Sequence, residues 1–464
     1  MLGRAEVERV HRSALRVLHE VGVKVESETL LSLLGDYGGE VGPDEQRVRF
    51  PSAFVEQFIA DSDKYDWESH QPRFGCYAGI YNSLYHNPET DGLEVFTERT
   101  LADYIRVGRA LPAVRSVELL GMPFTPEDIP AAYGPLGEKL YAWKYGAGAS
   151  GTVQFTGLCP YIVELYERFA EERRQSLEAV FGAVGYLVSP LRLASAECDQ
   201  LLYFRSRGLR MHIGHMLSMG ASAPVTVAGA AVLKLAESLF MSILHRALWG
   251  GRGLGVGGFG VVMDMLSAHS MGGRPEAAAI CAVLGQVARF YGVRSGGGGG
   301  LTDAKEPSVQ AGMQKAMLSV AVTLSAGSAA LDAGLLSLDE ICSPEQMVYD
   351  AELVSAIGHM LRPVDAGEEA CAAEDIAAVG VGGNFLGSEL TARRFRQELW
   401  QPRVWDRQSL ADWRKSGRKT ERDRVKDIIR GTLAESRKEP EISEECERDI
   451  RAIIERAVAA GAAE

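Results

Sequence analysis

The stretch GLGVGGFGVVMDMLSAHSMGGRPEAAAICAVLGQVARFYGVRSGGGGG (253–300) decides the fold. Two short Gly- and Val-rich runs at its ends flank an apolar-periodic segment at 275–291. Pro275 stands at the first turn of this segment and Gly292 stands just past its end, as is typical of the start and stop of a helix. The stretch therefore predicts a strand, a helix and a second strand, which is the repeating unit of a parallel sheet with crossover helices.

The same unit recurs on both sides of this stretch. Strands are predicted at 114–121, 151–155, 180–187, 211–216, 253–258, 293–300, 328–334 and 376–383. Helices are predicted near 133–145, 160–173, 194–207, 224–248, 275–291, 308–325, 345–361 and 388–399. Eight such units match an α/β fold of the (β/α)8 TIM barrel type. An open doubly wound sheet is the alternative.

The chain divides into three predicted regions. Residues 1–98 form a helical and aromatic N-terminal cap, residues 99–401 form the barrel, and residues 402–464 form a charged helical extension. The predicted barrel strands are rich in Gly and Ala. These small residues either let a wide ligand or a partner's cofactor approach the barrel mouth, or only relieve crowding inside the barrel.

Composition limits the classes of function. The chain has 464 residues, 46% hydrophobic, with a net charge of −13, which is an ordinary globular composition. The negative charge argues against nucleic acid and an anionic membrane surface as partners. Seven widely spaced cysteines without a C-x-x-C pair, and an N-terminus that lacks the apolar core of a signal peptide, predict a cytoplasmic protein.

Several familiar catalytic motifs are absent. The run 253–258 formally matches G-x-G-x-x-G but does not lead into a helix, so it lacks the context of a dinucleotide site. His212 and His215 lie three apart on a predicted strand, where they point to opposite faces, so no bound metal is predicted. No serine stands in a G-x-S-x-G elbow. This pattern suits a reaction whose reactive centre arrives on a cofactor.

Two carboxylates follow Gly-rich strand ends, where barrel enzymes place their active sites. Asp264 and Asp303 are therefore candidate catalytic residues, since each could balance the charge of a cationic substrate. Each could equally cap a helix or anchor a turn.

An aromatic segment precedes the first predicted strand. Tyr77, Tyr81, Tyr85 and His86 lie within ten residues of one another. Stacked aromatic faces bind quaternary ammonium groups through cation–π attraction, so these residues are candidates for substrate binding. The alternative is that they form the core of a small domain.

Several longer segments carry a family resemblance. They are RVHRSALRVLHEVGVKVES (9–27), VRFPSAFVEQ (48–57), NPETDGLEVFTERTLADYIRVGRALP (87–112), SPLRL (189–193), GASAPVTVAGA (220–230), VMDM (262–265), RPEAAAICA (274–282), GGGLTDAKEPSVQAGMQKA (298–316) and GGNFLGSELTARRFRQELWQPRVWDR (382–407). Through them the chain resembles the trimethylamine methyltransferase family, in particular its members without pyrrolysine, such as the glycine betaine methyltransferases.

The resemblance implies a barrel that transfers a methyl group from a methylated amine to cob(I)alamin on a separate corrinoid protein, in a homo-oligomer. Two departures bear on the substrate. Pyrrolysine is absent, and Asn384, Ser388 and Leu390 stand where many relatives have histidines. The resemblance therefore leaves the methyl donor open.

A quaternary, betaine-like amine is the expected donor, because C–N cleavage then releases a neutral amine without a general acid. Asn384 and Phe385 are expected to contact this substrate, and Arg192 to bind its carboxylate, although an ion pair at the barrel rim would explain Arg192 equally. Gly298, Gly299, Gly300 and Gly383 are expected to allow close approach of the corrin ring. Trimethylamine as donor, a non-catalytic amine-binding protein and a barrel enzyme of unrelated chemistry remain alternatives.

Overall fold

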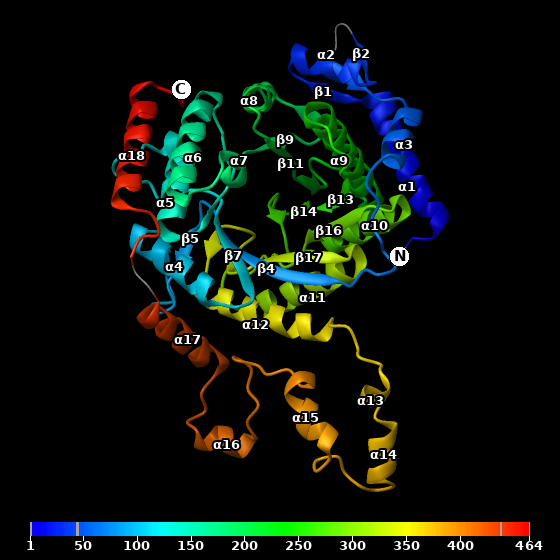
Figure 1. The fold of residues 1–464 in the computed structure, drawn as a ribbon, viewed down its shortest axis with the longest axis vertical. Helices are drawn as coiled ribbons and strands as arrows, with labels where there is room; N and C mark the ends of the chain where they lie inside the picture. The colour runs from blue at the N-terminus through cyan, green and yellow to red at the C-terminus, as the bar shows by residue number, and fades with distance from the viewer. Residues whose placement is uncertain (1, 43–45, 259, 437–438, 464) are drawn as a thin grey trace.

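A parallel sheet organises the chain. The computed structural model describes residues 2–42, 46–258, 260–436 and 439–463. Its largest sheet has six strands, all parallel, in the order β13, β16, β17, β4, β7 and β8 (Figure 1). Their bounds are β13 (Gly255–Gly258), β16 (Arg294–Gly298), β17 (Ser328–Asp332), β4 (Arg73–Ile80), β7 (Val114–Leu119) and β8 (Gly148–Ala149).

Further parallel pairs continue this arrangement. Thr152, just after β8, forms a parallel bridge to Val184 in β9 (Val184–Leu187), and β9 pairs with β11 (His212–His215). The strand β12 (Leu217–Met219) continues β11 and pairs in parallel with β14 (Gly260–Met263), which continues β13. The predicted α/β class with parallel strands is confirmed.

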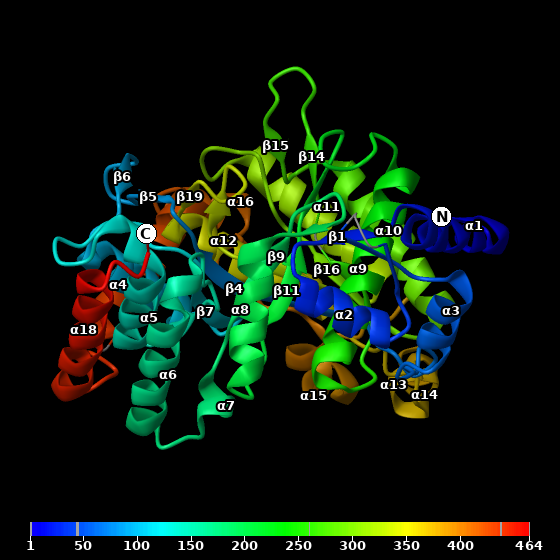
Figure 2. The same cartoon turned by 90° about the horizontal axis from the view of Figure 1, so that it is seen from above.

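Helices cover the outside of these strands (Figures 1 and 2). They are α4 (Glu98–Ala110), α5 (Gly134–Tyr145), α6 (Cys159–Arg173), α7 (Leu177–Val180), α8 (Ser195–Ser206), α9 (Val227–Trp249), α10 (Pro275–Tyr291), α11 (Val309–Ala326) and α12 (Pro344–Met360). Pro275 opens α10 and Gly292 closes it in the left-handed conformation, as the sequence predicted.

The strand predicted at 376–383 is wrong. Its first residues form helix α14 (Ala373–Val379), and Val381 is fully exposed. The Ala-rich composition favours a helix here. The sheet instead contains β4, between β17 and β7, so a strand comes from the region predicted as a cap. The division at residues 98 and 401 stays a prediction.

The remaining elements flank the sheet. A small sheet joins β1 (Val23–Val25), β2 (Glu40–Gly42), β3 (Arg47–Arg49) and β10 (Arg192–Leu193), near helices α1 (Arg4–Arg16), α2 (Glu28–Asp36) and α3 (Ser52–Ala60). Another joins β5 (Leu84–His86), β6 (Leu93–Val95), β18 (Leu335–Leu336) and β19 (Ile341–Cys342). The strand β15 (Ser270–Met271) pairs antiparallel with β14 in a hairpin that projects from one end of the molecule (Figure 2). The C-terminal helices are α13 (Glu368–Cys371), α14, α15 (Glu389–Glu398), α16 (Leu410–Lys415), α17 (Glu421–Glu435) and α18 (Glu444–Ala459).

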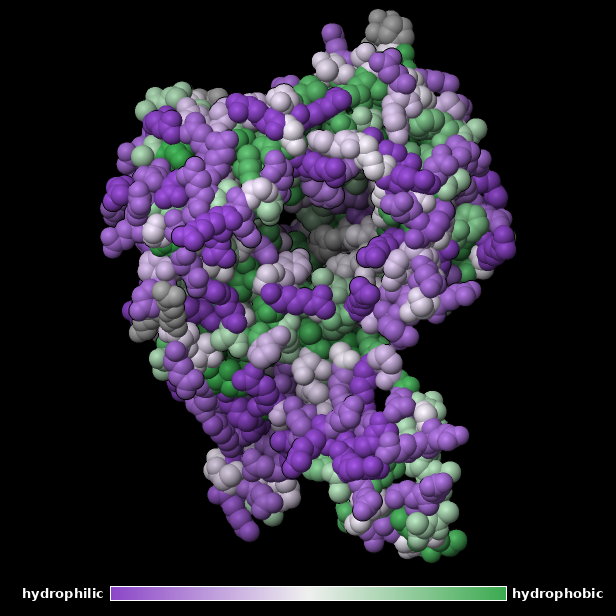
Figure 3. All heavy atoms as spheres, in the orientation of Figure 1, coloured by the Kyte–Doolittle hydropathy of each residue, from purple (hydrophilic) through white to green (hydrophobic). Residues whose placement is uncertain are grey.

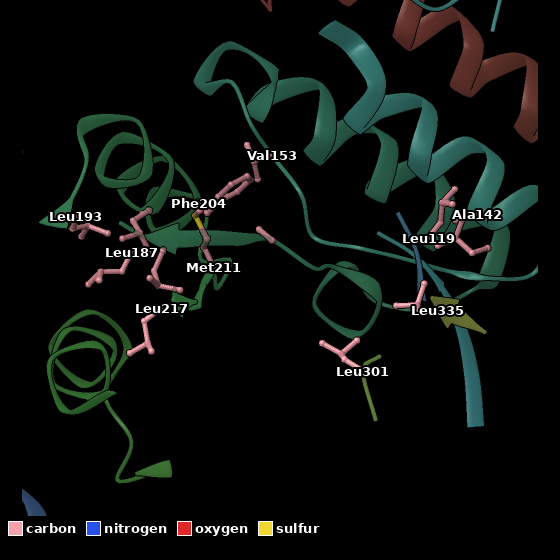
Figure 4. Packing of buried hydrophobic residues seen from close by; sticks show 14 of the residues in the cluster. Leu119, Ala142, Val153, Leu187, Leu193, Phe204, Met211, Leu217, Leu301 and Leu335 are labelled. Atoms are coloured by element: carbon pink, nitrogen blue, oxygen red, sulfur yellow. The ribbon is translucent and has the colours of Figure 1, made fainter. Parts of the chain in front are cut away.

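The hydrophobic core lies between strands and helices. Leu187 of β9, Met211 before β11 and Phe204 of α8 pack together in this layer (Figure 4). Among the described residues, α9 alone is long and apolar enough to cross a membrane, but 67% of its most apolar window is buried inside the protein. It also carries the buried residues Lys234 and Glu237, so its composition reflects a place in the core.

All seven cysteines are free thiols, and all but Cys371 are buried.

Candidate functional site

The strand β4 presents two faces with different chemistry. Cys76, Ala78 and Ile80 are buried in the core, while Tyr77 and Tyr81 lie on the opposite face. The register places Tyr77 beside Asp332, the last residue of β17. Burial and then the Asp332 carboxyl raise the pKa of both Tyr77 and Tyr81, so this carboxyl lies within electrostatic range of both hydroxyls.

Asp332 is an unusual carboxyl group. Burial raises its pKa from the usual 3.8 to about 6, against the opposing effects of the Tyr77 hydroxyl and the Lys315 ammonium. Its Oδ1 atom is buried and has no hydrogen-bond partner in the described structure. A buried carboxylate oxygen without a partner costs free energy. A bound cation in contact with Oδ1 would stabilise the ionised form of Asp332, because no donor of the described residues contacts this atom.

A buried ion pair fixes the backbone of Asp332 from behind. Lys315 of α11 donates to the Asp332 carbonyl at 3.1 Å and to the Asp350 carboxylate of α12 at 2.7 Å. Asp350 also accepts from the Gly334 amide and from Gln346. The turn after β17 is therefore held from two helices, which gives Asp332 a defined position.

A cavity of about 650 Å³ lies at the carboxyl ends of β4, β7 and β8. We call it the mouth cavity. Tyr81 and Phe124 supply aromatic faces, and Thr152 and Gln154 supply polar groups. The charged residues among its described lining are all acidic: Glu138, Asp339 and Glu340. Burial raises the pKa of Glu138 and of Asp339. An aromatic and acidic lining suits a cation.

The carboxylates of the two predicted catalytic residues, Asp303 and Asp264, accept hydrogen bonds from residues in loops. Asp303 accepts hydrogen bonds from the Gly272 and Gly273 amides at 2.8 and 3.2 Å, and from the Gln314 amide at 3.3 Å. Asp264 accepts from Ser267 in the hairpin loop, which is the main cause of its lowered pKa, and pairs with Arg274 at 2.8 Å. Both placements match the anchoring alternative, and a catalytic role for either stays a prediction.

Asp303 gives a stability prediction. In Asp303→Ala the amides of Gly272 and Gly273 lose their acceptor, so we expect a loss of about 2–3 kcal/mol in the free energy of unfolding. Urea denaturation followed by circular dichroism measures this change. Asp264→Ala, at an exposed hairpin, serves as the control and should change stability by less than about 1 kcal/mol. Equal stability of Asp303→Ala and the wild type would contradict the anchoring role.

The aromatic segment divides between two roles. Tyr77 and Tyr81 face Asp332, as described above. Tyr85 and His86 instead belong to β5, where both are buried. Tyr85 packs edge-on against Phe96, and His86 bonds to Ser343 and Asp91, at 3.0 Å each. The structure brings this second pair into a local core, as the alternative had it.

Arg192 forms an ion pair at the rim. Its guanidinium donates to both carboxylate oxygens of Glu26, at 3.0 and 3.2 Å, and its side chain is 50% exposed. Its pairing with Glu26 matches the rim ion pair that was weighed against carboxylate binding.

Asn384, Phe385 and Gly383 lie far along the chain's most exposed segment. Residues 361–403, which we call the projecting arm, contain no buried residue and extend away from the sheet (Figures 1 and 3). The Asn384 side chain accepts from the Leu386 amide, and Phe385 is exposed. The arm of one chain does not bring these residues to Asp332.

The three glycines at the end of β16 and just after it differ in their burial. Gly298 is exposed, whereas Gly299 and Gly300 are buried. A Cβ atom at Gly299 would lie 3.2 Å from Ala329 and Ser319, and one at Gly300 would lie 2.5 Å from Leu331. Close packing therefore accounts for Gly299 and Gly300, and contact with a corrin ring stays a prediction for Gly298.

Glu138 and Asp339 were not singled out from the sequence. Asp332 lies near the carboxyl end of the strand predicted at 328–334, but no role was assigned to it there. Its burial and its pairing with Tyr77 depend on β4, whose period-two alternation over RFGCYAGI (73–80) was the signal that could have revealed it.

Comparisons with known proteins agree on one family. The sequence model for trimethylamine methyltransferase matches residues 1–73 and 161–462. The glycine betaine methyltransferase of Desulfitobacterium hafniense (strain Y51) is 26% identical over 432 residues, which cover 88% of this chain and 87% of that protein. The trimethylamine methyltransferase of Methanosarcina barkeri (strain Fusaro) is 24% identical over 481 residues, covering 97% and 94%.

One solved structure also shares most of the chain. The monomethylamine methyltransferase of Methanosarcina barkeri aligns over 92% of this chain and 91% of its own, with 9% identity and a TM-score of 0.43. The family model does not match residues 74–160, which include Tyr77 and Tyr81. Since the model matches most of the sequence, the chain belongs to the trimethylamine methyltransferase family.

Proposed function

We propose that this protein transfers a methyl group from a quaternary, betaine-like amine to cob(I)alamin on a separate corrinoid protein. The acidic and aromatic lining of the mouth cavity carries the proposal, together with the Asp332 carboxyl, whose charge acts on Tyr81 of this lining. The names of the relatives support the class of reaction, since one acts on glycine betaine and another on trimethylamine.

The proposed reaction needs no general acid or base from the protein. The methyl carbon leaves nitrogen for cobalt, and the electron pair of the broken C–N bond stays on nitrogen, which becomes a neutral tertiary amine. The protein's task is then to hold the cation, orient one methyl group and exclude water. The Asp332 carboxylate and the Tyr77 and Tyr81 rings serve the first task.

We infer that the strands close into one (β/α)8 barrel. The pairings support this, because each of β4, β7, β8, β9, β11–β12, β13–β14, β16 and β17 has a parallel contact with the next, and β17 returns to β4. The surface is hollowed at the centre of this ring (Figure 3). A barrel places the mouth cavity at the carboxyl ends of the strands, where a corrinoid protein could cover it.

A second amine remains a candidate. Trimethylamine is the donor of the Methanosarcina barkeri relative, but its cleavage needs a protonated leaving group. Glu138, whose pKa burial raises, is the acid in the mouth cavity that favours this candidate. Calorimetric titration with glycine betaine, tetramethylammonium and trimethylamine tests binding. We expect both quaternary cations to bind and Asp332→Asn to weaken both, and exclusive binding of trimethylamine would overturn our choice of donor.

We also propose that the protein is a homo-oligomer in which a second copy covers the projecting arm. Apolar side chains stand exposed along this arm: Val364, Ile376, Val381, Phe385, Leu386, Phe395 and Leu399. A segment that buries nothing in its own chain needs a permanent partner. A corrinoid protein that must come and go suits this less well, because transient interfaces are more polar.

The arm gives a prediction about assembly. In Val381→Asp a charge replaces an apolar residue that is fully exposed in the single chain, so the fold should be unchanged. If a second copy covers it, the charge should weaken the subunit affinity by at least about tenfold. Sedimentation velocity across a concentration series measures this. Leu266→Asp, also exposed but at the hairpin tip, is the matched control and should leave assembly unchanged. A wild-type protein that is monomeric throughout would refute the oligomer.

A cytoplasmic location stays a prediction.

A further inference from the structure

A second cavity, of about 640 Å³, is lined by residues of β11, β13 and α9. Among the described residues, β11 pairs with β9 and β13 pairs with β16, but no pairing joins β11 to β13. Only their continuations, β12 and β14, meet. The two strands diverge at their amino-terminal halves, and α9 lies behind the gap. We call this space the seam cavity.

The charge of the seam cavity is opposite to that of the mouth cavity. The ionisable side chains among its described lining are Lys234, Arg294, His212, His215 and His245, and none is a carboxylate. The two cavities therefore select for ligands of opposite sign, and the cation proposed as methyl donor has no partner here.

Lys234 is the least satisfied of these groups. Its side chain is 1% exposed, and burial lowers its pKa to about 8. Its ammonium makes two long contacts, to Nε2 of His215 at 3.3 Å and to the His215 carbonyl at 3.5 Å. The ion pairs found among the described residues include none between Lys234 and a carboxylate: Glu237 pairs with His215 and acts on Lys234 only through its charge. A buried ammonium without a counter-ion is costly, and a bound anion would remove that cost.

A hydrogen-bonded network fixes the groups around Lys234. Nδ1 of His215 donates to the Glu237 carboxylate at 2.8 Å, which leaves Nε2 as the acceptor that faces Lys234 and Ser238. Glu237 also accepts from Ser189 and from the Leu191 amide. The Glu237 carboxylate therefore acts on Lys234 only at a distance, through its charge, and makes its hydrogen bonds with other groups. The polar end of the cavity is thus preorganised.

Beyond Lys234 and Ser238, the same helix α9 continues the wall of the seam cavity with apolar residues. Met241, Leu244, Leu248 and Trp249 from α9 line it. We propose that the seam cavity binds a small organic carboxylate, with its charged end at Lys234 and Ser238 and its apolar body against this wall. This site is distinct from the mouth cavity, so it stands independently of the methyl-transfer proposal.

Calorimetric titration of the full-length protein with hexanoate tests the proposal, with hexanamide as the uncharged match and inorganic phosphate as an anion without an apolar body. We expect hexanoate to bind and hexanamide to bind at least about tenfold more weakly. Phosphate that binds as well as hexanoate would overturn the organic class of ligand. Hexanamide that binds as well as hexanoate would overturn the anion site.

Lys234→Met removes the charge and keeps the length of the side chain. We expect it to weaken hexanoate about thirtyfold and to raise the melting temperature at pH 7, since it removes an uncompensated buried charge. Ser238→Ala should weaken hexanoate less and serves as a second variant if Lys234→Met misfolds. Hexanoate affinity that survives both substitutions would refute the assignment. Asp332→Asn is the control in the other cavity and should leave hexanoate binding unchanged.

Discussion

Asp332→Asn is expected to lower kcat/KM for methyl transfer by about a hundredfold and, at the same time, to stabilise the fold at pH 8. A carboxylate about 4–5 Å from a cation contributes about 3–4 kcal/mol at an effective dielectric constant of 20, which the amide loses. The stability gain follows from the pKa. Because the folded pKa of about 6 lies above the usual 3.8, the ionised side chain costs the fold about 3 kcal/mol.

The pH dependence gives this prediction its sign. The cost of Asp332 begins as pH rises above 4 and is complete above 6, so Asp332→Asn should stabilise at pH 8 and be nearly neutral at pH 3.5. Activity of the wild type should rise through pH 6 as the carboxyl ionises. Initial rates and urea denaturation at both pH values measure the two effects. A variant with full activity would remove Asp332 from the site, and one less stable at pH 8 would contradict its unpaired state.

Lys315→Met is expected to cost about 3–5 kcal/mol of unfolding free energy, because it leaves the Asp350 carboxylate buried without its cation. Both partners of this pair are almost fully buried, with side chains 0% and 1% exposed. Since Lys315 also holds the Asp332 carbonyl, activity should fall as well. Denaturant unfolding of the purified variant measures the loss.

The double variant Lys315→Met, Asp350→Leu is the matched control. Replacing both charges by apolar side chains is often neutral or stabilising, so part of the lost stability should return; the rest stays lost, because the Gly334 amide and Gln346 lose Asp350 as their acceptor. Activity should stay reduced, because the hold on the Asp332 carbonyl is still missing. A single variant as stable as the wild type would contradict the proposed role of the pair.

The sequence reveals the helices more reliably than the strands. Every helix predicted from 133 to 399 forms near its predicted position, because apolar periodicity and capping residues such as Pro275 and Gly292 are local signals. The segment 376–383 was predicted as a strand from its short apolar and Gly-rich run, but its first residues form α14, and β4 occupies the sheet position between β17 and β7. Strand membership depends on partners distant in sequence, and short apolar runs leave it undecided.

The candidate site shows the same limit. Tyr77 and Tyr81 were recognised from their residue type, which is a local property. Asp303 and Asp264 were selected because they follow Gly-rich strand ends. The Asp303 carboxylate instead accepts from the Gly272 amide, and the Asp264 carboxylate accepts from Ser267 in its own loop. The position of Asp332 beside Tyr77 arises only from the pairing of two strands more than two hundred residues apart. The unpaired ammonium of Lys234 likewise becomes visible only once β11 and β13 are seen to diverge.

Formation of methylcobalamin is the most direct test of the proposed methyl transfer. Purified protein is mixed with free cob(I)alamin under reducing conditions and with glycine betaine, tetramethylammonium or trimethylamine, and the cobalt species are followed by absorbance. We expect the wild type to form methylcobalamin from a quaternary amine, and we expect Asp332→Asn to form almost none. Tight binding of a quaternary amine without any methylcobalamin, even with a corrinoid protein present, would contradict the account and favour a binding protein.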